Sequence, residues 1–179
     1  MATLQLDENL IIRMASNDGA AFRELYQQTS GVVYGFAMSI LRNKHDAEDV
    51  MHDAFIRIHA SAVTYKPSGN PMAWILTIVR NLCLNRIRAG KVCEELPEYD
   101  ELAGTSNDSD TMLDRMVLET AMNVLDAEER QIVILHAMTG FKHREIAEIL
   151  DLPTGTILSK YNRALKKIRK EMESKGVDR

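Results

Sequence analysis

The stretch that decides the fold runs from residue 142 to residue 170 and reads KHREIAEILDLPTGTILSKYNRALKKIRK. Its apolar residues recur every three or four positions, first up to Leu150 and again from Ile157, which predicts a short helix over 142–150 and a final helix from Thr154. Only Asp151-Leu152-Pro153 separates the two. Two helices joined by such a turn, the second with basic residues facing outward, form the helix-turn-helix pattern of DNA-binding proteins.

The final helix offers a polar surface that suits DNA. Its apolar residues define the side expected to be buried: Ile157, Tyr161, Ala164, Leu165 and Ile168. Ser, Asn, Lys and Arg near the start of such a helix can reach base edges, and later basic residues neutralise phosphates. A solvated basic helix is the alternative interpretation. The predicted DNA-contacting residues are Thr156, Ser159, Lys160, Asn162, Arg163, Lys166 and Lys167.

Upstream of this pair the composition changes. Residues 92–111 combine Pro97, Gly104 and a polar run with few large apolar residues, which is typical of a flexible linker. This stretch is acidic, and it separates two basic segments, residues 77–91 and residues 154–175. We therefore expect two small helical domains, residues 1–91 and residues 112–179, joined by an acidic linker.

The N-terminal part also has helical periodicity. Apolar residues over 22–40 keep helical spacing, and Gly31 and Gly35 are expected to interrupt that helix. Asn43 is placed as the N-cap of a second helix, and Asn70-Pro71 as the start of a third.

Beyond the linker, residues 112–125 form another amphipathic stretch. Asp126 and Glu129 have capping-box spacing for a helix that runs through Met138 and ends at Gly140. Strand alternation is absent from the sequence, so the predicted fold class is all-α.

Composition excludes several classes of protein. Apolar residues make up 45% of the chain and aromatic residues 6%, which allows a core and favours helices over sheets. There is no run of 18 apolar residues, and the N-terminus lacks a signal-peptide pattern, so we expect no membrane insertion. Cys83 and Cys93 form no metal-type pair and suit a reducing cytoplasm, where we expect the protein to reside.

The histidines argue against an enzyme. His45, His52 and His59 recur every seven residues, and side chains seven apart on a helix lie about 10 Å apart, too far to share one metal ion. The sequence also lacks a phosphate-binding glycine loop, a nucleophile elbow and a metalloenzyme signature. We expect no catalytic residues, no metal and no cofactor.

An acidic stripe is predicted on the second helix. Asp46, Asp49 and Asp53 are spaced three and then four positions apart, which places them on one face expected to be exposed. Such a face repels DNA but suits a protein partner that carries basic residues. A merely solvated face is the alternative interpretation.

Three segments together resemble the extracytoplasmic-function (ECF) class of bacterial RNA polymerase sigma factors. Asp46-Ala-Glu-Asp-Val50, followed by Asp53-Ala-Phe-Ile-Arg57, resembles the polymerase-binding helix of that family. The segment from Ala73 through Asn81 to Arg88 resembles its promoter −10 helix, and the helix-turn-helix resembles its −35-reading domain. The resemblance covers about residues 18–170.

The resemblance implies an alternative sigma factor that directs core polymerase to promoters and opens them. The loop over 63–70 lies where the family captures an unstacked base, a role that aromatic stacking would suit. Trp74 is either a core residue or a second stacking platform. The implied polymerase-binding residues are Asp46, Glu48, Asp49, Val50, Asp53, Phe55 and Arg57. The implied −10 DNA-binding residues are Tyr65, Lys66, Asn70, Thr77, Arg80, Asn81, Asn85 and Arg88.

The implied partners are bacterial core RNA polymerase, promoter DNA (duplex at −35 and opened at −10) and an anti-sigma factor. Two rival hypotheses are a dimeric helix-turn-helix regulator of duplex DNA and an adaptor that binds polymerase without recruiting it to promoters. Promoter opening would separate them. The sequence departs from the family pattern at His59, in the 65–71 loop, and at Lys142, Asp151, Leu158 and Leu165.

Overall fold

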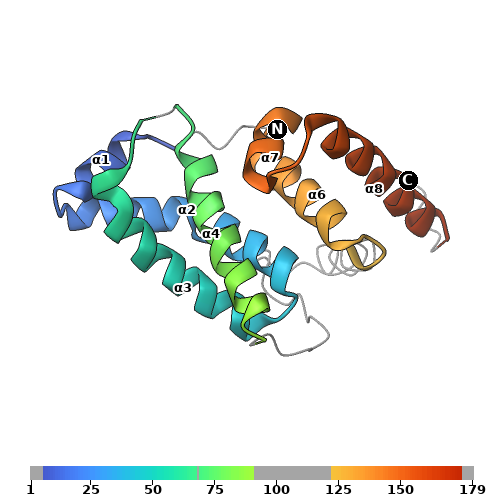
Figure 1. Cartoon of the computed structure of the whole chain (residues 1–179), viewed down its shortest axis with the longest axis horizontal. Coiled ribbons are helices and arrows are strands. Elements are labelled where there is room, and N and C mark those ends of the chain that lie inside the picture. Colours follow the sequence, from blue (N-terminus) through green and yellow to red (C-terminus); the bar gives the residue numbers. More distant parts are fainter. Residues whose placement is uncertain (1–5, 68, 91–121, 175–179) are drawn as a thin grey trace, which may run out of the picture.

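The structure is a computed structural model that describes residues 6–67, 69–90 and 122–174. All of its regular elements are helices (Figure 1), which confirms the predicted all-α class. The expected linker, nearly all of the amphipathic stretch 112–125, and Cys93 lie outside the described residues. The helices are α1 (Asn9–Ala15), α2 (Gly19–Leu41), α3 (Lys44–Ser61), the short 3-10 helix η1 (Ala62–Thr64), α4 (Pro71–Arg88), α6 (Ala127–Thr139), α7 (His143–Leu150) and α8 (Thr154–Ser174).

Side-chain caps begin the helices where the sequence predicts. The Asn43 side chain accepts from the backbone N–H of Asp46 at 2.9 Å, and Asn70 caps α4 at 3.2 Å. Asp126 and Glu129 form a reciprocal capping box at the start of α6, with bonds of 2.8 and 3.0 Å. Each bond satisfies a backbone N–H that has no partner within its own helix.

Two features of the N-terminal part differ from the prediction. Helix α2 runs without a break through Gly31 and Gly35, so the expected interruption is wrong. Its other side chains are well packed, and that packing outweighs the roughly 1 kcal/mol that each glycine costs. Helix α1 was not predicted, although its buried residues Leu10, Ile11 and Met14 have helical spacing.

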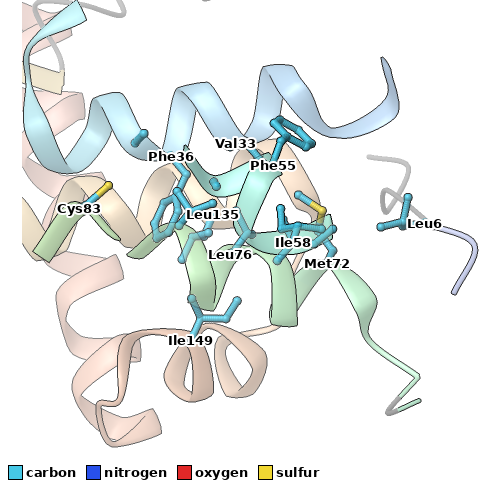
Figure 2. Close-up of a cluster of buried hydrophobic side chains, with 14 of the residues drawn as sticks. Leu6, Val33, Phe36, Phe55, Ile58, Met72, Leu76, Cys83, Leu135 and Ile149 are labelled. Carbon is cyan, nitrogen blue, oxygen red and sulfur yellow. The ribbon is translucent and has the colours of Figure 1, made fainter. Parts of the chain in front are cut away.

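One apolar cluster contains buried side chains from both the N-terminal and the C-terminal helices (Figure 2). Phe36 of α2, Ile58 of α3 and Leu76 of α4 are fully buried at its centre. Leu135 of α6 and Ile149 of α7 belong to the same cluster. The N-terminal region (residues 6–90) and the C-terminal region (residues 122–174) therefore share a core in this structure.

Polar contacts reinforce this junction. Arg130 of α6 is buried and donates to the carbonyl of Ser39 in α2 at 3.1 Å, as well as to two carbonyls just before α6. Arg42 donates to the side chain of Asn123 at 2.9 Å. Helix α6 accordingly lies against α2, and α7 lies against α4. Among the described helices, none is both long and apolar enough to cross a membrane.

Candidate polymerase-binding and DNA-binding surfaces

The outer surface of α3 carries the exposed part of the predicted polymerase-binding set. Asp49, Asp53 and Arg57 are exposed along it, and the half-buried Glu48 lies beside them. Ile56 lies among them with 69% of its surface exposed, unusual for so large an apolar residue. A mixed surface of this kind, acidic with one apolar side chain, fits a protein partner better than DNA.

Asp46 is not part of that surface, so the predicted stripe of three exposed aspartates is wrong at this position. Only 6% of its side chain is exposed, because α4 covers it. Arg86 of α4 donates to Asp46 at 2.6 Å and to Asp49 at 2.7 Å. Burial disfavours the charged guanidinium, but these two carboxylates outweigh it and raise the pKa of Arg86. Asp46 therefore joins α3 to α4.

Val50 and Phe55, also predicted to bind polymerase, are buried on the inner side of α3. The Phe55 ring packs edge-on against Phe22 and lies 4.6 Å from the ring of Tyr26, centroid to centroid. Their side chains do not reach the surface. Val50 and Phe55 instead pack α3 against α2. This packing fixes the orientation of α3 and so directs Asp49 and Asp53 outward.

Helix α4 presents a continuous polar stripe. Thr77, Asn81, Asn85 and Arg88 are all exposed, and their spacing of four, four and three residues keeps them on one face of the helix. The opposite face carries Met72, Ile75, Val79 and Cys83, which are buried. The structure thus brings together four of the eight residues predicted to contact the −10 DNA.

Two further predicted −10 residues are engaged by the C-terminal region. Arg80 donates to the carbonyl of Leu150, the last residue of α7, at 3.0 Å. Asn70 donates to Oε1 of Glu145 at 3.2 Å while it caps α4. The other oxygen of Glu145 accepts from the backbone N–H of Lys142 at 2.8 Å and helps to begin α7.

The loop before α4 holds an aromatic pair. The ring of Tyr65 lies 4.8 Å from that of Trp74, and both rings pack against the core cluster from a half-buried position. The Tyr65 hydroxyl donates to Glu8, which also accepts from the backbone N–H of Gly69 at 3.2 Å. Lys66 is exposed beside them. No sequence pattern pointed to Glu8, because 57 residues separate it from Tyr65.

The turn of the helix-turn-helix depends on Asp151. This residue ends α7 in the left-handed conformation, with φ of 53°. The backbone N–H of Leu152 then returns to the carbonyl of Ala147 at 3.1 Å. An aspartate tolerates positive φ better than most residues, which explains how the turn forms without glycine.

On α8, the predicted DNA-contacting residues divide between two sides. Ser159, Asn162, Arg163 and Lys166 are exposed, and Thr156 is half-buried. Lys160 and Lys167 instead turn toward α6. The Leu165 side chain is 42% exposed, so the expectation that it is buried is wrong, and Leu158 is 48% exposed on the same helix.

The two inward lysines neutralise the acidic first turn of α6. Lys160 lies 2.9 Å from Glu128, which accepts a hydrogen bond from its ammonium and raises the pKa of that group. Lys167 lies 2.6 Å from Glu129, which is fully buried. Asp126 is partly buried, which raises the pKa of a carboxyl, but the Glu129 N–H and the charge of Lys160 outweigh this and lower it. These pairs hold α8 in place.

Comparison with known proteins identifies the family. The model of sigma-70 region 2 matches residues 25–92, which include α3 and α4, and that of sigma-70 region 4 matches residues 115–168, which include the helix-turn-helix. The chain belongs to the ECF group of sigma-70 RNA polymerase sigma factors. That family consists of transcription initiation factors, not enzymes.

Two curated ECF sigma factors illustrate the match. The chain is 33% identical to SigE of Mycolicibacterium smegmatis over 165 residues, which cover 87% of the chain and 64% of SigE. It is 24% identical to SigL of Mycobacterium tuberculosis over 170 residues, which cover 92% of the chain and 96% of SigL. The chain thus spans just under two thirds of the length of SigE and nearly all of SigL.

Two solved structures have a similar fold. The sigma factor RpoE of Bartonella quintana, in complex with the anti-sigma factor NepR, matches with a TM-score of 0.67 and 25% identity, over 88% of this chain and 98% of that one. CnrH, in complex with the cytosolic domain of CnrY, matches with a TM-score of 0.69 and 20% identity, over 94% and 97%.

Proposed function

We propose that this sigma factor recruits core RNA polymerase to promoters through three separate surfaces and promotes strand opening at the −10 element. The observation that carries the proposal is the polar stripe of α4, which ends in Arg88 and begins beside the aromatic pair Tyr65 and Trp74. Cationic and polar groups next to stacked rings are the means by which proteins hold single-stranded DNA.

The first surface, on α3, binds polymerase. Asp49, Asp53 and Arg57 supply the charged contacts, and Ile56 supplies an apolar one at their centre. An exposed apolar residue ringed by charges is a common arrangement at protein interfaces, where the charges select the partner and the apolar group contributes affinity.

The second surface reads the opened −10 strand. The Thr77, Asn81, Asn85 and Arg88 stripe lies along the strand, and the loop that contains Tyr65 and Lys66 captures a base. Polar side chains along one face of a helix can donate to the strand, while a terminal arginine neutralises a phosphate.

The third surface, on α8, enters the duplex at −35. The first half of this helix, where recognition helices contact base edges, carries Ser159, Asn162 and Arg163. Lys166 follows them and contacts the phosphate backbone of the DNA. The exposed Leu158 adds an apolar contact of the kind that the methyl group of thymine accepts.

We also propose an anti-sigma factor as a partner, because the similar RpoE structure contains one. The chain would act in the cytoplasm, where polymerase and promoters are found. A protein in this role should compete with core polymerase for the chain and abolish transcription. A candidate that binds the chain and leaves transcription unchanged would not fill it.

The test of the main proposal combines the purified chain with sigma-free core polymerase and promoter fragments, and maps the transcription starts. Discrete new starts that share upstream elements are expected. The paired variant D49A/D53A should weaken polymerase binding, whereas E24A, on an exposed face of α2, should not. Duplex DNA binding without any polymerase binding would favour a helix-turn-helix regulator, and polymerase binding without new starts would favour an adaptor.

A further inference from the structure

Glu8 stands out because its side chain serves a loop far away in the sequence. It is the N-cap residue of α1, yet its side chain makes no capping hydrogen bond to that helix. The side chain of Asp7 makes the local bond instead: its Oδ1 accepts from the backbone N–H of Asn9, the first residue of α1, at 2.9 Å. Glu8 Oε1 instead accepts from the Tyr65 hydroxyl and from the backbone N–H of Gly69. One carboxylate oxygen thus holds both ends of the 65–69 loop.

Helix α1 is a firm support for this carboxylate. Leu10, Ile11 and Met14 are almost completely buried, and α1 packs against α2, α3 and η1. An ion pair of 2.7 Å between Arg13 and Asp18 ties the end of α1 to the start of α2. A carboxylate on such a support holds its partners in place at a smaller entropic cost than one on a mobile segment.

The two bonds constrain the parts of the loop that matter for base capture. The phenol bond leaves the Tyr65 ring one orientation against Trp74. The second bond holds Gly69, whose φ of 75° belongs to the left-handed region, directly before Asn70 begins α4. An aromatic ring stacks well on a base only when its plane is already oriented, because ordering it during binding reduces affinity.

We infer that Glu8 is a positioning residue for base capture at the −10 element: it orients Tyr65 and the 65–69 loop before the DNA strand opens. This inference rests on the proposed role of that loop in binding the opened strand. Glu8 lies outside the match to sigma-70 region 2, which begins at residue 25. The inference therefore adds α1 to the promoter-opening apparatus, through contacts that the family match does not include.

The test measures open-complex formation by the reconstituted holoenzyme with E8A, E8Q and the matched control E24A. Glu24 is exposed on α2, where it accepts from Gln28, four residues on. We expect E8A to reduce open complexes by about fivefold, the low end of what loss of one base-stacking contact gives, because the Tyr65 ring itself remains. E8Q keeps a neutral acceptor and should fall between E8A and the wild type. Polymerase affinity should stay unchanged.

A second measurement separates positioning from a purely structural role. On promoters randomised across the −10 element, E8A should relax the base preference at one position only. In a Y65A background, E8A should have a much smaller further effect, because the ring that it orients is gone and only its bond to Gly69 remains to be lost. A merely destabilised fold would lower transcription on every promoter alike and would do so with or without Tyr65. Thermal unfolding of each variant sets an assay temperature at which all are folded.

The outcomes distinguish this inference from the proposed function. If E8A matches E24A in open-complex yield and base preference while Y65A is defective, the inference is wrong and the loop keeps its proposed role. The inference is also wrong if E8A is equally harmful in the Y65A background. If neither Tyr65 nor the α4 stripe affects opening, or the wild type forms no open complexes, the proposed function fails and the inference fails with it.

Discussion

At the residue scale, some of the charges that mark this chain as a binding protein are paired inside it. Arg86 belongs to the basic segment and Asp46 to the acidic stripe, yet the two pair with each other between α3 and α4. Asp49 shares the same guanidinium from its exposed position. A residue's chemical type thus indicates which interactions it can make, whereas burial decides whether the partner is another molecule or the chain itself.

We predict that R86A destabilises the protein by about 3 kcal/mol, because it removes the guanidinium that pairs with the nearly buried carboxylate of Asp46. R88A removes an arginine two positions away that is exposed on the surface, and should change stability by less than about 0.5 kcal/mol. Urea unfolding followed by circular dichroism measures both. Equal effects of the two substitutions would contradict the structural role of Arg86.

Cys83 provides a second prediction. Burial in the core raises the pKa of its thiol to about 12, so Cys83 itself is almost entirely protonated in the folded protein at pH 8. In the unfolded chain the pKa returns to about 8.5. In a C93S variant, a thiol reagent should therefore modify Cys83 only in unfolded molecules, at a rate proportional to the unfolded fraction. Near pH 9 the Cys83 thiol ionises only in the unfolded state. The free energy of unfolding should therefore decline as the pH rises through that value.

The rate of labelling, measured against urea concentration, checks this prediction. It should rise with the unfolded fraction and reach the rate of a free thiol once unfolding is complete. Rapid labelling in the absence of urea would mean that Cys83 is accessible in the native state.

At the scale of the elements, the sequence predicted where helices begin. It predicted only in part which side of each helix faces solvent. Asn43, Asn70 and Asp126 cap their helices through neighbours three residues away, so the local sequence contains the whole interaction. The side of α8 that carries Lys160 and Lys167 depends on α6, which is distant in the sequence. Periodicity could not distinguish lysines that face outward, where DNA can bind, from lysines that pair with α6. It also could not place Glu8 beside Tyr65.

We therefore predict a division among the basic residues of α8. R163A and K166A should weaken holoenzyme binding to promoter DNA, and each should reduce the slope of log affinity against log salt by about 1. K167A should leave that slope unchanged but destabilise the protein by about 2 kcal/mol, because it leaves the buried Glu129 without its cation.

Salt titrations of promoter binding and urea unfolding of the same variants measure the two effects. The matched comparison is K166A with K167A, which are adjacent lysines on opposite sides of the division. A reduced salt slope in K167A would mean that this lysine leaves Glu129 and reaches the DNA.

At the scale of the whole molecule, the C-terminal region binds side chains of the N-terminal region that are predicted to contact DNA. Asn70 and Arg80, both predicted to contact the −10 strand, donate instead to Glu145 and to the carbonyl of Leu150. The shared core and the bond from Arg130 to Ser39 hold the regions in this arrangement. Because these donors cannot serve the protein acceptors and the DNA at once, this arrangement and full −10 contact exclude each other.

The last prediction follows from that exclusion. Fluorescent dyes placed at the exposed positions Ala60 of α3 and Lys170 of α8, in a C93S background, report the distance between the two regions. Promoter DNA alone should leave energy transfer unchanged, since the weak contacts of one region do not offset separation of the shared core. Core polymerase with promoter DNA should lower it, because both regions are then occupied by other partners.

Dyes at Ala60 and Ala89, both in the N-terminal region, are the control and should respond to neither addition. Unchanged transfer between Ala60 and Lys170 in an active open complex would mean that the regions stay together on the promoter. Arg80 would then keep its bond to Leu150, and the −10 strand would be read by Thr77, Asn81, Asn85 and Arg88 alone.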